Sequence, residues 1–162
     1  VKIKKGAEVV TKAAHDMSAD VLIIEMGSNG GWDDYDELIS QYKAMIANSG
    51  TQCYIIIGDT DNPDEAIDSE NYNISKEVGL NDTLWEAALR EAFGDHFINM
   101  RTYLMQNALD ITGKEANETD IENLLDGRVP DSIKYDYTHL NGYGYYAYGV
   151  GVYEKGVELG YW

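Results

Sequence analysis

The chain has 162 residues, 44% of them apolar and 11% aromatic, which is long enough for one globular domain with a sizeable core. Its 29 acidic and 12 basic residues give a formal charge of −17, which argues against nucleic acid and anionic membranes as partners. The single Cys53 excludes an internal disulfide. We find neither a signal peptide nor an apolar run that could span a membrane.

Strand-like and helix-like stretches alternate along the chain. Residues 21–24 and 53–57 are short apolar runs of the kind found in strands covered on both faces, and residues 97–100 form a third short strand. Helical spacing or propensity marks residues 7–16, 33–48, the stretch ending at 93, residues 103–126 with a break around Gly113, and residues 142–161. The expected caps and stops are Asp33 or Asp34 with Gly50, and Asn81 or Asp82 with Gly94.

This alternation predicts one α/β domain over residues 1–162, with a mostly parallel sheet between two layers of helices. Six glycines weaken the case for a regular helix over residues 142–161. In open parallel sheets, binding sites form where the strands end, at their carboxyl edge. We therefore look for functional residues directly after the predicted strands.

Asp136 and His139 form one candidate catalytic pair. A carboxylate that accepts the Nδ1–H of a histidine fixes the ring's tautomer and leaves Nε2 free to take a proton from a nucleophile. Because Asp-x-x-His is a short pattern, the pair could instead be a helix cap and a turn histidine.

A second candidate lies after the first predicted strand, in the sequence Gly27-Ser28-Asn29-Gly30-Gly31. Its glycines permit a tight turn, from which the Asn29 amide could donate a hydrogen bond into the crevice. A neutral donor at that place suits an oxyanion. Taken alone, the stretch also reads as an ordinary turn.

Together, Gly27-x-Asn29 and Asp136-x-x-His139 resemble the SGNH hydrolases, the GDSL-like esterases and lipases. Residues 41–46, 93–101 and 129–132 add to the similarity, which covers nearly the whole chain. The resemblance implies a three-layer α/β/α fold with a flavodoxin-like sheet and no cofactor or metal. It also implies Asn29 as an oxyanion donor, His139 as general base and acid, and Asp136 as its partner. Gly27, Ser28 and Gly30 would lie at the substrate.

The chain departs from the family at the nucleophile. The family opens with a strand ending in Gly-Asp-Ser, and no such block precedes Gly27. Gly58-Asp59-Thr60 mimics it but follows the Asn block and carries Thr, so we interpret it as coincidence. Ser28 lies at the variable position inside the Asn block and is a poor candidate for the nucleophile. We favour a domain that lacks its first strand here, with the Ser on a preceding segment or another chain; a degenerate domain or a different nucleophile are the alternatives.

The expected function is two-step hydrolysis of O-acyl esters, with carbohydrate as the substrate class that the resemblance suggests. Without the Ser, this chain alone should be nearly inactive. The competing interpretation is a non-catalytic carbohydrate-binding or structural module built on a degenerate SGNH framework. The compartment stays open, although an extracellular, cell-surface or virion location is the one we favour.

Three further clusters allow a functional and a structural interpretation. Acidic residues between 59 and 70 approach the spacing of a calcium loop, but Pro63 and Asp64 break the pattern and favour a solvated acidic loop over residues 59–76. His15 and His96 are expected to be surface or packed histidines. Six tyrosines could stack on sugar rings, although core or interface packing is favoured; these are Tyr135, Tyr137, Tyr143, Tyr145, Tyr146 and Tyr148.

Overall fold

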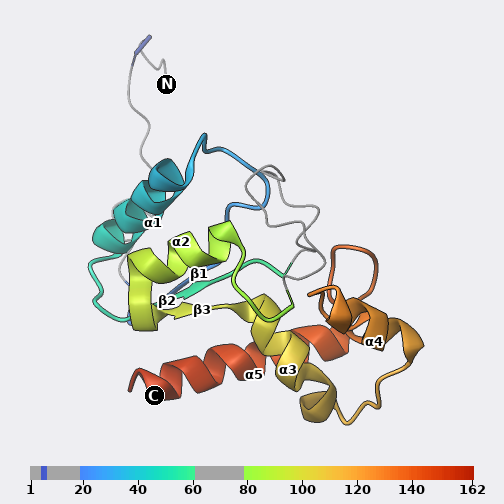
Figure 1. Cartoon of the computed structure of the whole chain (residues 1–162). Coiled ribbons are helices and arrows are strands. Elements are labelled where there is room, and N and C mark those ends of the chain that lie inside the picture. Colours follow the sequence, from blue (N-terminus) through green and yellow to red (C-terminus); the bar gives the residue numbers. More distant parts are fainter. Residues whose placement is uncertain (1–4, 7–18, 61–78) are drawn as a thin grey trace.

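The structure, a computed structural model, describes residues 5–6, 19–60 and 79–162. In this part of the chain, a three-stranded parallel sheet is combined with five α-helices, which confirms the predicted α/β class (Figure 1). The helix expected over residues 7–16, His15 and most of the acidic loop lie outside the described residues.

The sheet consists of the three predicted strands in the order β1-β2-β3, all parallel. Their bounds are Leu22–Ile24 for β1, Tyr54–Ile57 for β2 and Phe97–Ile98 for β3. Ile23 lies opposite Ile55, and Ile57 lies opposite Ile98. The third strand is shorter than predicted because the next residue, Asn99, caps the following helix.

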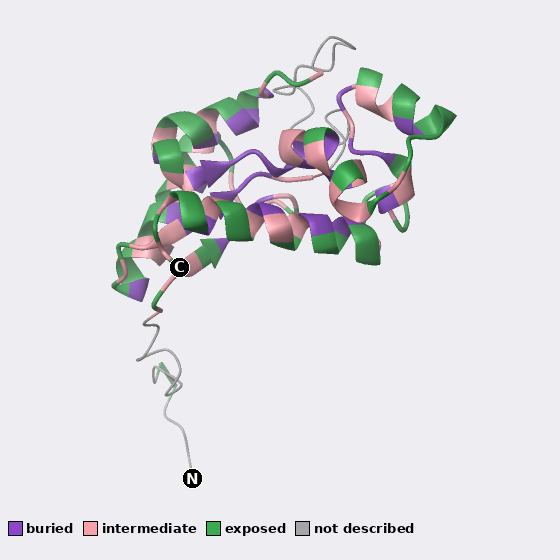
Figure 2. Cartoon of the chain, turned by 90° about the horizontal axis from the view of Figure 1, so that it is seen from below, coloured by how far each residue is buried: buried purple, intermediate pink, exposed green. Residues whose placement is uncertain are grey.

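Helices cover both faces of this sheet (Figure 1). They are α1 (Tyr35–Ser49), α2 (Leu84–Phe93), α3 (Met100–Thr112), α4 (Glu118–Leu125) and α5 (Gly142–Glu158), with short 3-10 turns at Gly94–His96 and Asp131–Ile133. One apolar cluster joins α1 and α2 to Ile24, Ile56 and Phe97. The other joins α3 and α5 to the remaining inward-facing residues of β2 and β3. Buried residues therefore concentrate in the strands and on the helix sides that face them (Figure 2).

Capping by side chains sets where the helices begin. Asp34 caps α1 as one of the two expected residues, and Gly50 ends the helix with a positive φ of 71°. The cap predicted for α2 is wrong: Thr83, rather than Asn81 or Asp82, accepts the N–H of Glu86, whose carboxylate accepts the N–H of Thr83 in return. This reciprocal pair satisfies two backbone donors, one more than a lone side-chain cap.

Helix α3 begins at Met100, three residues before the predicted start. The Asn99 side chain accepts the N–H of Thr102 at 3.1 Å and thereby ends β3 and opens α3 at the same residue. Gly113 then closes the helix, as the predicted break indicated.

Strand β1 departs from the prediction that both its faces are covered. Ile24 is buried against α1 and α2, but Ile23, which points to the opposite face, is 46% exposed. β1 also ends the sheet, since it pairs with β2 on one edge and with no described strand on the other. Among the residues that the structure describes, one strand edge and part of one sheet face are therefore open.

Helix α5 turns its tyrosines outward, opposite to what core packing would require. Gly144, Ala147 and Gly151 face the core, whereas Tyr146 and Tyr153 are about 60% exposed. The glycines allow close approach: a Cβ on Gly144 would lie 2.3 Å from the carbonyl oxygen of Ile133. Core packing is therefore wrong for Tyr146, whereas the expected interface role stays a prediction.

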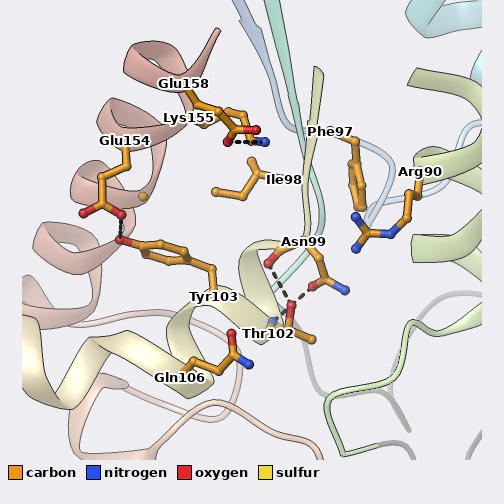
Figure 3. Close-up of a pocket in the computed structure, with 11 residues that line it drawn as sticks. Arg90, Phe97, Ile98, Asn99, Thr102, Tyr103, Gln106, Glu154, Lys155 and Glu158 are labelled. Carbon is orange, nitrogen blue, oxygen red and sulfur yellow. Dashed lines mark hydrogen bonds and ion pairs between the residues drawn. The ribbon is translucent and has the colours of Figure 1, made fainter. Parts of the chain in front are cut away.

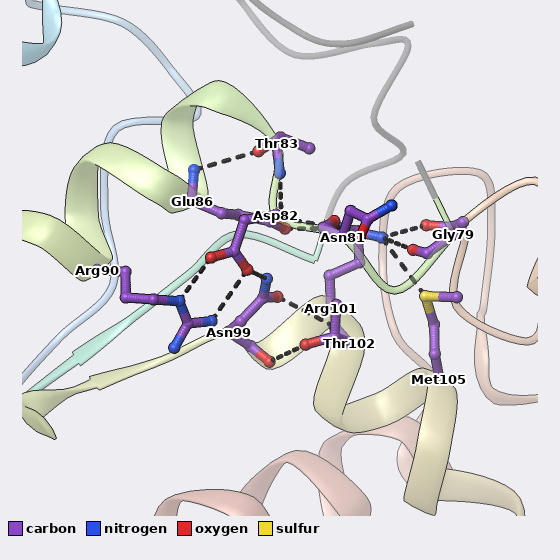
Figure 4. Close-up of polar contacts among 11 residues, drawn as sticks. Gly79, Asn81, Asp82, Thr83, Glu86, Arg90, Asn99, Arg101, Thr102 and Met105 are labelled. Carbon is purple, nitrogen blue, oxygen red and sulfur yellow. Dashed lines mark hydrogen bonds and ion pairs between the residues drawn. The ribbon is translucent and has the colours of Figure 1, made fainter. Parts of the chain in front are cut away.

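A buried arginine ties two loops, the one before α2 and the one after α4, to the start of α2 (Figure 4). The Arg101 guanidinium grips both oxygens of Glu86, at 2.7 Å each. It also donates to the carbonyls of Gly79, Asn81 and Gly127 at 2.7 to 2.8 Å. These bonds use all five N–H groups of the side chain, which is 1% exposed. A buried charge that is fully paired in this way holds its partners in one geometry.

Replacing Arg101 with Ala should lower the free energy of unfolding by about 3–5 kcal/mol, because Glu86 would remain buried as an uncompensated charge. Arg101→Lys should also destabilise, since an ammonium cannot reproduce the planar fork. Urea denaturation followed by circular dichroism measures both. The matched control is Arg90→Ala, whose half-exposed pair with Asp82 should contribute about 1 kcal/mol or less. Equal losses at the two arginines would contradict this account.

Two glycines of α5 should respond in opposite directions to alanine. Gly144→Ala should destabilise the protein by about 1–3 kcal/mol, because the new methyl group collides with the backbone of Ile133. Gly149→Ala meets nothing within 4 Å and should stabilise the helix by about 0.5–1 kcal/mol. Thermal unfolding of both variants measures the difference, and a stabilising Gly144→Ala would show that α5 is not packed as described.

Candidate active site

The loop before α5 is closed on itself and holds Asp136 and His139 at its tip. Lys134 and Leu140 form an antiparallel bridge, and the N–H of Tyr135 donates to the carbonyl of His139 at 2.8 Å. The loop therefore has a defined shape although its tip is exposed to solvent.

Asp136 binds His139 in two ways. Its Oδ1 accepts the backbone N–H groups of His139 at 2.7 Å and of Thr138 at 3.0 Å. Nδ1 of His139 lies 2.9 Å from both carboxylate oxygens. The backbone N–H of His139, followed by its ring and the N–H of Thr138, holds the pKa of Asp136 below its ordinary value. Such a carboxylate favours the Nδ1–H tautomer and leaves Nε2 as the basic atom. The helix-cap alternative is wrong, because Asn141 caps α5.

The turn after β1 is held by its first glycine. The carbonyl of Gly27 accepts the N–H of Gly30 and the indole N–H of Trp32, both at 2.9 Å. Gly27 has a φ of 114°, and a Cβ there would lie 2.8 Å from the ring of Trp85. Only glycine fits this position. Ser28 and Asn29 consequently occupy the tip of a turn fixed to the core.

Ser28, Asn29 and His139 line one cavity of about 220 Å³. Its walls come from the carboxyl ends of β1 and β2, the loop before α5, and α5 itself. The lining residues are Glu25, Ser28, Asn29, Asp59, Thr60, Thr138, His139, Leu140, Tyr145 and Tyr148. Asp136 does not line the cavity itself, but it contacts His139, which does. Gly27 and Gly30, expected at the substrate, shape the turn without lining the cavity.

Five lining residues were not predicted as site residues, namely Glu25, Asp59, Thr60, Thr138 and Leu140. Glu25 follows β1, and Asp59 and Thr60 follow β2, so the rule that parallel strands end at one edge could have found them. Tyr148 donates its hydroxyl to Oε2 of Glu25 at 3.0 Å. Partial burial raises the pKa of Glu25, and the nearby charge of Asp59 adds to the rise, whereas the Tyr148 bond opposes it.

The other candidates lie away from the cavity or at its rim. Of the six tyrosines, Tyr145 and Tyr148 line the cavity, whereas Tyr135, Tyr137, Tyr143 and Tyr146 are exposed outside it. His96 is packed, as expected: its ring stacks on Tyr54 at 4.0 Å, and its Nδ1 lies 2.9 Å from the hydroxyl of Tyr161.

A second cavity of about 290 Å³ lies between α3, α5 and β3 (Figure 3). Its polar side chains are engaged with one another: the Tyr103 hydroxyl donates to Glu154 at 2.7 Å, and Lys155 pairs with Glu158 at 2.8 Å. It combines no histidine or cysteine with a nucleophile. The first cavity is therefore the better candidate for catalysis.

No family model matches this chain, and comparison with curated proteins and with solved structures likewise yields no match. Within the described residues, no helix has the length and apolar character needed to cross a membrane. The same part of the chain holds no group of three or more His, Cys, Asp or Glu side chains placed to bind a metal ion. The calcium alternative rests mainly on residues outside the described part.

The carboxyl group of Asp136 should titrate below 3.8, and carbon-detected NMR measures the midpoint directly. Because the folded pKa is lowered, the stability that this group contributes is present above its unfolded pKa and is lost as the pH falls through the folded value. His139→Ala removes the ring but keeps both N–H donors, so the midpoint should rise only part of the way. A midpoint at the ordinary value in the unmodified chain would contradict the described loop geometry.

Proposed function

We propose that the chain is the part of an SGNH-type serine esterase that carries the base and one oxyanion donor. The observation that supports this most is the shared cavity of Asn29 and His139, which come from opposite ends of the sequence. The Asp136 contact to Nδ1 adds the orienting carboxylate that such a base requires. The order and spacing of the two motifs, which resemble those of the SGNH hydrolases, add support.

The proposed reaction transfers an acyl group in two steps. A serine Oγ attacks the ester carbonyl while Nε2 of His139 takes its proton, and Asp136 stabilises the resulting imidazolium. The Asn29 amide donates to the tetrahedral oxyanion, and His139 protonates the departing alcohol. His139 then removes a proton from water, which attacks the acyl-enzyme and releases the acid.

The proposed source of the serine is a preceding segment or a second chain that pairs with the open edge of β1. A strand parallel to β1 would end at the same edge of the sheet as β1 and β2, next to the cavity. The edge of β1 that no described strand occupies would gain a pairing partner, which an open strand edge calls for. The resulting sheet would be the flavodoxin-like sheet of the family with its first strand restored.

A second candidate is a non-catalytic carbohydrate-binding or structural module with the same framework. The exposed tyrosines beside the cavity favour it, because they offer contact area that ester hydrolysis does not need. O-acylated carbohydrate is the substrate class that we propose for the esterase.

The decisive experiment compares this chain with a longer protein that includes the segment encoded directly upstream of Val1. The longer protein should hydrolyse p-nitrophenyl acetate, and a fluorophosphonate probe should label a serine upstream of Val1. Asn29→Ala should lower kcat by about 10²–10³-fold, and His139→Ala should reduce it at least as far. His96→Ala, remote from the cavity, is the matched control and should retain activity.

Two outcomes would contradict the proposal. One is a longer protein that shows no probe-labelled serine and no esterase activity, which favours the non-catalytic module. The other is activity of the 162-residue chain that Ser28→Ala or Thr60→Ala abolishes, because the nucleophile would then lie within this chain.

A further inference from the structure

Exposed aromatic side chains form a band along α5 that begins at the candidate active site. Tyr145 lines the cavity, and Tyr146 and Tyr153, two turns apart, lie on one outer side of the helix. Trp162 continues the band, with its ring 6.3 Å from that of Tyr153 and an interplanar angle of 21°. We call these four residues, with Gly149 between them, the aromatic strip.

The strip is held in shape by contacts beneath it. The indole N–H of Trp162 donates to the carbonyl of Tyr153 at 3.0 Å, and its ring covers Gly156, where a Cβ would leave no room for it. Nothing lies within 4 Å of the Cβ position of Gly149, so the helix surface stays low between Tyr146 and Tyr153. The result is an exposed aromatic surface along a helix, with about half or more of each residue open to solvent.

The strip carries no charge, although a quarter of the chain's residues are charged. The three charged residues of α5 belong to another side of the helix, where they line the second cavity (Figure 3). Glu154 there accepts the hydroxyl of Tyr103, and Lys155 pairs with Glu158. Four exposed aromatic side chains with no charge among them are a candidate binding surface on so acidic a protein.

We propose that the aromatic strip binds a neutral polysaccharide chain and extends the candidate active site along α5. A pyranose ring has an apolar C–H face that packs on an aromatic ring and a polar rim that bonds to tyrosine hydroxyls. The rings of Tyr153 and Trp162 lie 6.3 Å apart, and a polymer bound there would run along α5 past Tyr146 towards Tyr145. The polymer would then pass the cavity where an acyl group is removed.

The charge of the chain favours a neutral polymer over a protein as the partner of the strip. Two copies of a chain with a charge of −17 repel each other, and a basic protein would seek carboxylates, which the strip does not provide. A neutral, amphipathic polymer is not repelled by the negative charge and does not need carboxylates to bind. The inference deepens the proposed function by naming a polymeric substrate, but the binding is measured without turnover, so either proposal can fail alone.

Affinity gel electrophoresis of the 162-residue chain tests the strip, with glucomannan, arabinoxylan or hydroxyethylcellulose in the gel and polygalacturonate as the anionic comparison. At least one neutral polymer should retard the chain, and polygalacturonate should not. Tyr153→Ala and Tyr146→Ala should each raise the dissociation constant by about three- to tenfold. Tyr135→Ala, an exposed tyrosine off the strip, should leave it unchanged, and circular dichroism verifies that all variants fold.

Retardation by none of the three neutral polymers would overturn the proposal, as would retardation that the strip variants leave unchanged. Self-association in sedimentation velocity that Tyr153→Ala abolishes would also overturn it, because the strip would then be an interface between copies. Retardation that survives His139→Ala but is lost with Tyr153→Ala supports polymer binding independently of the esterase chemistry.

Discussion

The contact between Arg101 and Glu86 is the interaction on which the rest of the structure depends most. Glu86 completes the cap of α2. Its carboxylate also accepts two hydrogen bonds from Arg101, which lies buried in the first turn of α3. The carbonyls of Gly79, Asn81 and Gly127 are bound to the same arginine, so loops far apart in sequence meet at one charge. Helices α2 and α3, which pack on opposite faces of the sheet, are thereby fixed relative to each other.

The candidate site combines a rigid half with an exposed half. The turn with Asn29 rests on the core, because Gly27 lies directly beneath the ring of Trp85. The loop with His139 is ordered by its own hydrogen bonds, but two-thirds of the histidine side chain is open to solvent. Under the proposed function, this half would gain most from a segment that shields the base from solvent.

Features that depend on neighbouring residues could be predicted from the sequence. The cap at Asp34, the three apolar strands and the glycine stops follow from the chemistry of neighbouring residues, and the structure confirms them. Asn81, Asp82 and Thr83 are all good cap residues, and only the glutamate three positions after Thr83 distinguishes them. The sequence could not show which side of α5 packs on the core, because its glycines and its tyrosines both recur at helical spacing. The bond between Glu25 and Tyr148 depends on tertiary packing and has no local signal.

The packing of Trp85 on Gly27 has a consequence for how this site can evolve or be engineered. The position of the Asn29 amide is inherited from the shape of a hydrophobic cluster that includes Leu38 and Trp85 rather than from polar groups at the cavity. Interior substitutions that change the shape of this cluster should therefore move the Asn29 amide without touching a residue that lines the cavity. Under the proposed function, random mutagenesis selected for turnover should recover such second-site changes within α1 and α2, where a map of polar contacts alone would not place them.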